Sequence, residues 1–323
     1  MIKDTDYAYA DARLKANENK LLTTSDIETL VSCRSVKDCY DFLAAKGWKL
    51  DETVGLTEAL KQQNQELWQL LSESVPDKSV LDVLTVCNDY FNVKAALKAS
   101  FVGTEAERLF VYPTSVDLEM LQTSIKRHDF DALGERMGNA AREAYQAALT
   151  SESGQAADII IDRAALDALS ARSKESQCGL AEEIARLLCT FADIKTAYRS
   201  ARTGKSASFL EKAVSDGGAL DRKTLIEKSE KGENELLDYL QKTDYKKAAS
   251  LLSKSTVEFE KYCDDAVIEE AKKAKYCFLG FEPVLAFYYA KQAELKCVRI
   301  IIGAKQNGLS EEAVRERVRA LYG

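Results

Sequence analysis

Apolar residues recur every three or four positions along most of the chain, which is the pattern of amphipathic helices. In the segment 81–101, for example, Leu81, Leu84, Cys87 and Phe91 follow this spacing. Helix breakers are scarce, since the 323 residues include only 3 Pro and 15 Gly. An all-β protein would need many more tight turns than these residues supply. The pattern therefore predicts an all-α protein.

Three stretches of similar sequence lie 101 positions apart. They read NVKAALK from Asn92, DIKTAYR from Asp193 and ELKCVRI from Glu294. Each begins with an acid or an amide, continues with an aliphatic residue and then has a lysine; these lysines are Lys94, Lys195 and Lys296. Equal spacing of a whole segment indicates duplication.

Other elements recur with these stretches. The segments SDIETL from Ser25, VDLEML from Val116 and LDRKTL from Leu220 each place an aspartate four residues before a leucine. An acid at that place is typical of the start of an amphipathic helix. The sequences around Asp162 and Asp264 also resemble each other. Together these repeats predict three units of helices.

The repeats predict three quasi-equivalent helical-bundle domains rather than three unrelated ones. We place the boundaries near residues 104 and 205, which gives domains 1–104, 105–205 and 206–323. Gly103 and Gly204 follow the first two long helical segments, and glycine is favoured just beyond a helix C-terminus. We expect both glycines to end a helix.

The first residues of the three stretches are candidates for a structural role. We expect Asn92, Asp193 and Glu294 to hydrogen-bond neighbouring helices or to cap helix ends within each copy. The alternative is an exposed ion pair with a lysine or arginine three to six positions away, which stabilises a helix by only about 0.3–0.5 kcal/mol. Neither interpretation makes these residues catalytic.

Composition and charge restrict the classes of protein to which this chain could belong. The chain is 46% hydrophobic and 30% charged, as soluble globular proteins usually are. Its net charge of −7 argues against nucleic-acid binding, which normally requires a basic face. The 8 cysteines include no C-x-x-C pair, so we expect free thiols in a reducing cytoplasm. The N-terminal MIKDTDYAYADAR lacks the apolar segment of a signal peptide, and the most apolar segment, 278–290, is too short to span a bilayer.

Three motifs invite a chemical interpretation, and each has a simpler one. His128 is the only histidine and lies in a charged stretch, so we interpret it as a surface residue. The sequence GKS at 204–206 lacks the earlier glycine of a phosphate-binding loop, because Arg199 occupies that position. The acids of CDDAVIEE from Cys263 have no second cluster with which to bind a magnesium diphosphate. We expect no catalytic residue, metal or cofactor, and interpret the segment 215–218, SDGG, as a turn.

The last forty residues carry a specific resemblance. They read GFEPVLAFYYAKQAELKCVRIIIGAKQNGLSEEAVRERVRALY and closely resemble the end of the C subunit of V/A-type rotary ATPases, which is called the d subunit in the eukaryotic enzyme. The matching positions are Gly280, Glu282, Pro283, Glu294, Lys296, Arg299, Gly308 and Leu309, together with Asp89, Asn92 and Lys94 earlier in the chain and Tyr7, Tyr9 and Arg13 near its start. The sequence departs from the family pattern at Trp48, Cys297 and Ala304.

The resemblance implies a structural component of a rotary machine. Members of this family are all-α funnels of three similar domains around a pseudo-threefold axis. They sit on the cytoplasmic face of the membrane ring of proteolipids and receive the central shaft, which consists of the D and F subunits. Such a socket has no catalytic role, takes no small-molecule substrate and transmits the torque that links ATP to proton or sodium transport. It meets the membrane only through the ring.

Two other classes remain open from the residues alone. A free-standing helical-repeat adaptor would bind proteins or peptides without ring or shaft, and a helical enzyme of isoprenoid type would bind Mg²⁺ and diphosphate. The contact residues toward ring and shaft are not identified by the sequence. Arg315, Arg317 and Arg319 are candidates for an acidic partner, although we favour a solvated helical face for them.

Overall fold

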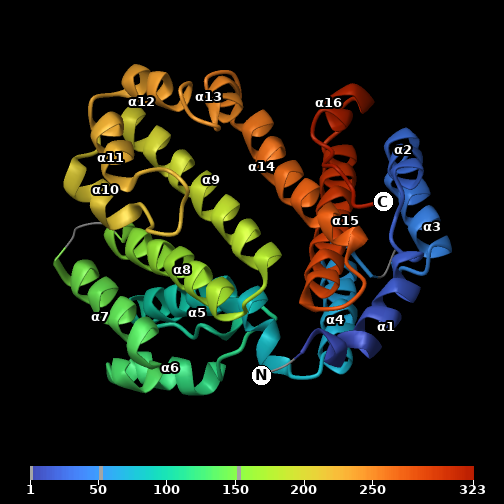
Figure 1. Cartoon of the computed structure of the whole chain (residues 1–323), viewed down its shortest axis with the longest axis horizontal. Helices are drawn as coiled ribbons and strands as arrows, with labels where there is room; N and C mark the ends of the chain where they lie inside the picture. Colours follow the sequence, from blue (N-terminus) through green and yellow to red (C-terminus); the bar gives the residue numbers. More distant parts are fainter. Residues whose placement is uncertain (1–2, 51–53, 151–153) are drawn as a thin grey trace. The chain divides into compact units, whose positions relative to one another are not determined.

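The computed structural model describes residues 3–50, 54–150 and 154–323. Within these ranges every regular element is a helix, which confirms the all-α prediction (Figure 1). The chain forms two compact units: the first unit comprises Met1–Lys78 and Lys247–Gly323, and the second unit comprises Ser79–Lys246. The division into three domains at residues 104 and 205 stays a prediction.

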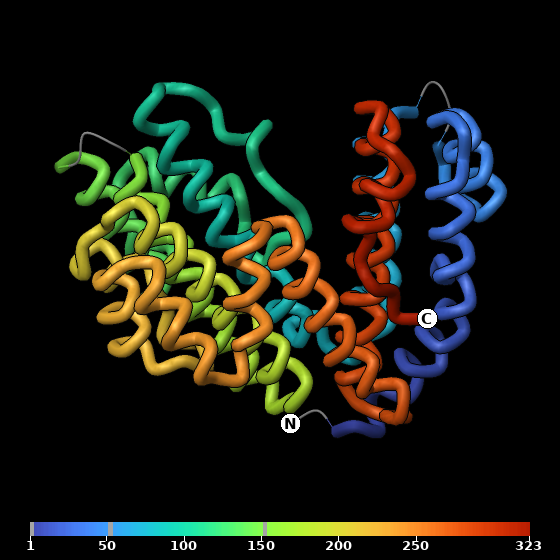
Figure 2. Tube along the Cα trace, turned by 90° about the horizontal axis from the view of Figure 1, so that it is seen from above, coloured from blue at the N-terminus to red at the C-terminus, as the bar shows by residue number. Residues whose placement is uncertain are grey.

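The first unit is organised around the longest helix, α15. Its helices are α1 (Ala8–Glu18), α2 (Thr24–Ser32), α3 (Val36–Ala45), α4 (Leu56–Ser74), α14 (Thr256–Ala271), α15 (Phe281–Gln306) and α16 (Glu311–Arg315), with the short 3-10 helices η1 (Asp4–Tyr7) and η5 (Lys272–Tyr276). Helix α15 contacts each of these helices, and it meets η1 through the rings of Phe281 and Tyr7. Figure 2 shows it beside the N-terminal helices, so segments nearly 300 residues apart share one core.

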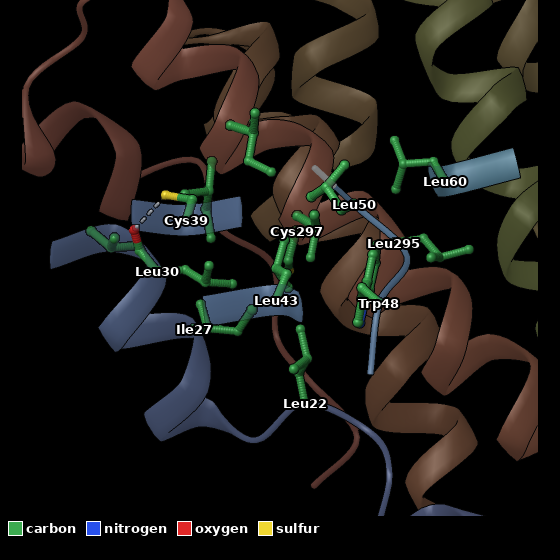
Figure 3. Packing of buried hydrophobic residues seen from close by; sticks show 14 of the residues in the cluster. Leu22, Ile27, Leu30, Cys39, Leu43, Trp48, Leu50, Leu60, Leu295 and Cys297 are labelled. Carbon is green, nitrogen blue, oxygen red and sulfur yellow. Dashed lines mark hydrogen bonds between the residues drawn. The ribbon is translucent and has the colours of Figure 1, made fainter. Parts of the chain in front are cut away.

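The core of the first unit lies between α15 and helices α2 to α4. Figure 3 shows Leu43 beside Cys297 of α15 and Leu30 beside Cys39 of α3, and Ile301 of α15 also belongs to this core. The three departures from the family pattern, Trp48, Cys297 and Ala304, are all buried in this core. At these three positions the chain therefore differs from the family pattern in the packing of its core and not in its surface.

The second unit is centred on α8. Its helices are η2 (Lys78–Leu81), α5 (Asp82–Val102), η3 (Glu107–Leu109), α6 (Leu118–Arg127), η4 (Phe130–Leu133), α7 (Glu135–Thr150), α8 (Gln155–Glu175), α9 (Gly179–Thr203), α10 (Ala207–Ala213), α11 (Arg222–Glu230) and α12 (Glu233–Leu240), and α13 (Lys246–Leu252) begins at the boundary between the units. Helix α8 packs against α5, α7, α9 and α10 (Figure 1). Its neighbours α5 and α9 carry the first two copies of the repeated stretch.

The predicted helix ends are confirmed. Gly103 and Gly204 follow α5 and α9 in the left-handed conformation, with φ of 74° and 64°. Asp117 and Asp221 accept a backbone N–H of the first turn and so cap α6 and α11. Asp26 is the exception, because it stands in the first turn of α2 and forms a capping box with Thr23.

No helix in the described part of the chain combines the length and the apolar character that crossing a membrane requires.

Candidate functional site

The three long helices α5, α9 and α15 each carry one buried polar residue at the same place in the repeat. Asn92, Asp193 and Glu294 have exposed fractions of 0%, 3% and 1%. A buried polar side chain is costly unless it is hydrogen-bonded. We call these three residues the anchors, because each of them holds a non-helical segment against its long helix.

The first anchor, Asn92, holds the segment 111–115. Its amide nitrogen donates to the carbonyl of Val111 at 3.0 Å, and its amide oxygen accepts the N–H of the same residue at 2.8 Å. One turn earlier on α5, the carboxylate of Asp89 accepts the N–H of Ser115 at 2.9 Å and the hydroxyls of Thr114 and Ser115. Two side chains of one helix thus fix both ends of the segment.

The second anchor repeats this arrangement on α9. The carboxylate of Asp193 accepts the N–H of Ser215 at 2.9 Å and its hydroxyl at 2.8 Å. One turn earlier, the hydroxyl oxygen of Thr190 accepts the N–H of Ala219 at 2.8 Å. In both copies the anchored residues stand four positions apart, and the residue that caps the next helix, α6 or α11, follows two positions later.

The third anchor, Glu294, binds the other end of the chain. One carboxylate oxygen accepts the N–H of Leu22 at 2.8 Å, and the other accepts the Lys291 ammonium at 2.5 Å. Leu22 directly precedes Thr23, which caps α2. Lys291 stands three positions from Glu294, but Glu294 is buried and the Lys291 side chain is only 13% exposed, so the pair does not resemble an exposed surface bridge.

The anchors contact segments between helices, whereas the sequence suggested neighbouring helices or helix ends within each copy. Val111 and Ser215 lie beyond the boundaries expected at residues 104 and 205, and Leu22 lies in a different predicted domain from Glu294. Each long helix therefore contacts the segment that the numbering would assign to the next copy, and the last one contacts the first.

The three anchors differ in charge. Burial raises the pKa of Asp193 to about 7, while the two hydrogen bonds from Ser215 oppose the shift. Asn92 performs the same contact as a neutral amide, and Glu294 faces a cation. The same structural contact is thus made with three different charge arrangements.

The SDGG segment 215–218, which the sequence indicated to be a turn, leaves no room for a side chain at either of its two glycines. A side chain on Gly217 would stand 2.8 Å from the sulfur of Cys189, and one on Gly218 would stand 2.9 Å from the Asp193 carboxylate. These two glycines are needed because the backbone lies directly against α9. The two glycines of SDGG are evident in the sequence, but the sequence does not show that α9 packs against them.

The chain matches a known protein family over most of its length. The model of the ATP synthase (C/AC39) subunit family matches residues 10–317. The chain is a member of this family.

Two relatives illustrate the range of this C/AC39 family. The chain is 26% identical over 269 residues to the C subunit of the V-type sodium ATPase of Enterococcus hirae, which covers 81% of each protein. It is also 26% identical over 339 aligned positions to the C subunit of the A-type ATP synthase of Methanocaldococcus jannaschii, covering 96% of this chain and 85% of the relative. The similarity therefore extends over both units.

Lys94 and Lys296, at equivalent places in the repeated stretch, each pair with an acid of a neighbouring helix in this member of the C/AC39 family. Lys94 pairs with Asp162 of α8 at 2.5 Å, and Lys296 pairs with Asp264 of α14 at 2.6 Å. Their similar sequences thus correspond to similar helix-to-helix ion pairs. Lys195 is half-buried on α9, and Arg299 is exposed on α15.

The residues considered for chemistry have structural surroundings. His128 is exposed and ends α6 in a left-handed conformation, as a surface residue. Asp264 pairs with Arg319, and Asp265 accepts the N–H of Ala320 at 2.7 Å, so these acids fasten the C-terminal segment. The prediction that the terminal arginines lie on a solvated helical face is wrong for Arg319, which is only 8% exposed. The reason is that α16 ends at Arg315 and the chain after it folds inward.

One buried acid was missed by the sequence analysis. Asp11 on α1 is 8% exposed and accepts the N–H of Gly280, at the start of α15, at 3.1 Å. Burial raises the pKa of Asp11 to about 6, and the nearby carboxylates of Glu282 and Asp4 add to the rise. No periodic signal distinguishes this aspartate from the exposed acids around it.

Proposed function

We propose that this chain is a non-catalytic component of the central stalk of a V/A-type rotary ATPase. In this proposal it forms a socket that joins the shaft, made of the D and F subunits, to the membrane ring of proteolipids. It stands on the cytoplasmic face, meets the membrane only through the ring, and transmits torque during proton or sodium transport. The observation that carries the proposal is the family match over residues 10–317.

The names of the relatives support the same assignment. One is part of a V-type sodium ATPase and another belongs to an A-type ATP synthase. Both are parts of ATP-linked complexes. We infer that this chain also works as one part of such a complex and takes its place through protein contacts.

The repeated anchors support a role in transmitting force. A coupling that carries torque must resist twisting, and close-packed helices transmit strain because their interiors have low compressibility. Each anchor adds buried hydrogen bonds that tie a connecting segment to a long helix. In the proposed arrangement, three domains, residues 1–104, 105–205 and 206–323, are tied to one another by these anchors and form a funnel with pseudo-threefold symmetry around the shaft.

The test is reconstitution of the rotary complex in liposomes with and without this chain. ATP hydrolysis and ATP-driven ion uptake are measured in the same preparation. We expect both activities with the chain, and hydrolysis without ion uptake in its absence, because the shaft would turn without driving the ring. A variant changed only at an exposed ion pair, Glu58→Ala, should support both activities.

Two results would count against the proposal. Unchanged ion uptake without the chain would show that it does not couple shaft to ring. Failure of the purified chain to bind either the D–F shaft or the ring, together with binding to unrelated helical peptides, would favour the free-standing adaptor instead.

A further inference from the structure

The segment 214–219 is held by two carboxylates from two different helices. Asp193 of α9 accepts the N–H and the hydroxyl of Ser215, and Asp167 of α8 accepts the N–H of the next residue, Asp216, at 2.8 Å. Asp193 has an exposed fraction of only 3%. Two consecutive backbone N–H groups thus donate to carboxylates from two helices, and the charge of Asp167 adds to the rise in the pKa of Asp193 that burial causes.

The surroundings offer incomplete compensation for these negative charges. The side chain of Arg222 on α11 donates to the carbonyl of Val214 at 3.1 Å and pairs with Asp216 at 3.5 Å. Arg163 lies 3.9 Å from Asp167 on the same helix. Other titratable groups near this pair include the Asp216 carboxylate, whose charge also acts on Asp167, Tyr90 on α5 and Cys189 on α9. Burial raises the pKa of Cys189 to about 12, so this thiol stays neutral.

The equivalent anchor in the preceding copy is neutral, although the buried carboxylate of Asp89 holds the same segment from one turn earlier. Asn92 makes both of its backbone bonds as a neutral amide. The fold therefore does not require a carboxylate at this place in the repeat. An acid at the second anchor adds a property that the contact itself does not need.

We propose that Asp193 and Asp167 form a proton-sensitive clamp on residues 214–219, which is tighter when the pair holds a proton and looser when both acids are ionised. This inference goes beyond the proposed function and does not rest on it. When a proton is bound, the buried pair carries one negative charge. When it leaves, two ionised acids lie beside the same segment, and opening of this segment brings both charges into contact with water, where they are better solvated.

The direction of the pH effect follows from the pKa of Asp193. Its pKa is about 7 in the closed state, against 3.8 for the same group in water. An acid whose pKa is raised by folding stabilises the closed state at low pH, and that contribution is lost as the pH rises through the folded pKa. With these two pKa values, the equilibrium constant for opening of the segment 214–219 should be about tenfold larger at pH 8.5 than at pH 6.

The experiment is amide hydrogen exchange of the full chain, followed by mass spectrometry at both pH values. Exchange rates are divided by the intrinsic rate at each pH, so that only the opening equilibrium remains. We expect peptides covering residues 214–219 to lose about tenfold protection at the higher pH. Peptides covering residues 111–115, held in part by the neutral Asn92, should lose less.

Two matched variants separate the clamp from a general pH effect. Asp193→Asn reproduces the neutral anchor of the first copy and should remove most of the pH dependence at 214–219. Asn92→Asp introduces an acid at the first anchor and should give residues 111–115 a larger loss of protection at high pH than they have in the unmodified chain. Equal protection of 214–219 at both pH values in the unmodified chain would overturn the proposal.

If Asp193→Asn does not fold, Asp167→Asn provides the second measurement. This change keeps an acceptor for the Asp216 N–H and removes the repelling charge. It should reduce the tenfold difference, because ionised Asp193 is then less unfavourable. An undiminished difference in this variant would contradict a clamp made by the pair.

Discussion

The carboxylate of Glu294 accepts the backbone N–H of Leu22 at 2.8 Å across 272 positions of sequence. The contact joins the longest helix, α15, to the segment that leads into α2. It therefore fastens the N-terminal helices to a helix near the end of the chain. Because Glu294 also holds the Lys291 ammonium, removal of this one side chain would leave both the Leu22 N–H and this ammonium without their partner.

Glu294→Ala should destabilise the protein by on the order of 3–5 kcal/mol, since it leaves a nearly buried ammonium without its counter-charge and an N–H without its acceptor. Glu294→Gln should cost less, about 1–3 kcal/mol, because its amide oxygen can still accept the Leu22 N–H. Urea denaturation followed by circular dichroism measures both changes. Glu58→Ala is the control, because its 3.8 Å pair with Lys61 is exposed and should matter by less than about 0.5 kcal/mol. An Ala variant as stable as this control would refute the role of the anchor.

Asp89 and Asn92 should show strong coupling in a double-mutant cycle, because both hold the segment 111–115. Each single change to alanine should cost about 1–3 kcal/mol. Once one side chain is gone the segment is partly released, so the double variant should lose less than the sum, by about 0.5–3 kcal/mol. Denaturant titration of the four proteins gives the coupling energy. Strict additivity would mean that the two side chains act on independent structures.

Sequence reasoning predicted the helical class, the repeat spacing and the ends of individual helices. These features depend on local properties, namely the spacing of apolar residues and the conformation that Gly103 and Gly204 adopt after a helix. The partners of the anchors were not predicted in the same way. They depend on which segments meet in space, and the contact between Glu294 and Leu22 has no local signature.

At the candidate site too, the sequence indicated some of the important residues but not those whose role depends on burial. The repeat pointed to Asn92, Asp193 and Glu294, because duplication preserves positions that the fold uses. It did not point to Asp11, whose importance comes from burial against the start of α15. It also gave no reason to separate Arg319 from the neighbouring arginines, because burial of this side chain follows from the early end of α16.

Asp11 should make stability depend on pH in the mildly acidic range. Its pKa is raised from 3.8 to about 6, so its contribution is complete below pH 4 and is lost as the pH rises through 6. Asp11→Asn should remove this part of the dependence and raise stability at pH 7.5 by on the order of 1–3 kcal/mol. Urea denaturation at pH 4, 5, 6 and 7.5 compares the two proteins. Parallel stability profiles for the variant and the unmodified chain would contradict the assigned burial effect.

Gly218 and Gly303 should respond to substitution by alanine in opposite directions. At Gly218 the new methyl group would stand 2.9 Å from the Asp193 carboxylate and 3.5 Å from the backbone of Thr190. Gly218→Ala should therefore destabilise the chain by about 1–3 kcal/mol through overpacking. Gly303 lies inside α15 with nothing within 4 Å of an added methyl group, so Gly303→Ala should stabilise it by about 0.5–1 kcal/mol through helix propensity. Thermal and urea denaturation of both variants measure the two signs. A stabilising alanine at Gly218 would mean that segment 214–219 is not packed closely against α9, and the clamp proposed for Asp193 would lose its geometric basis.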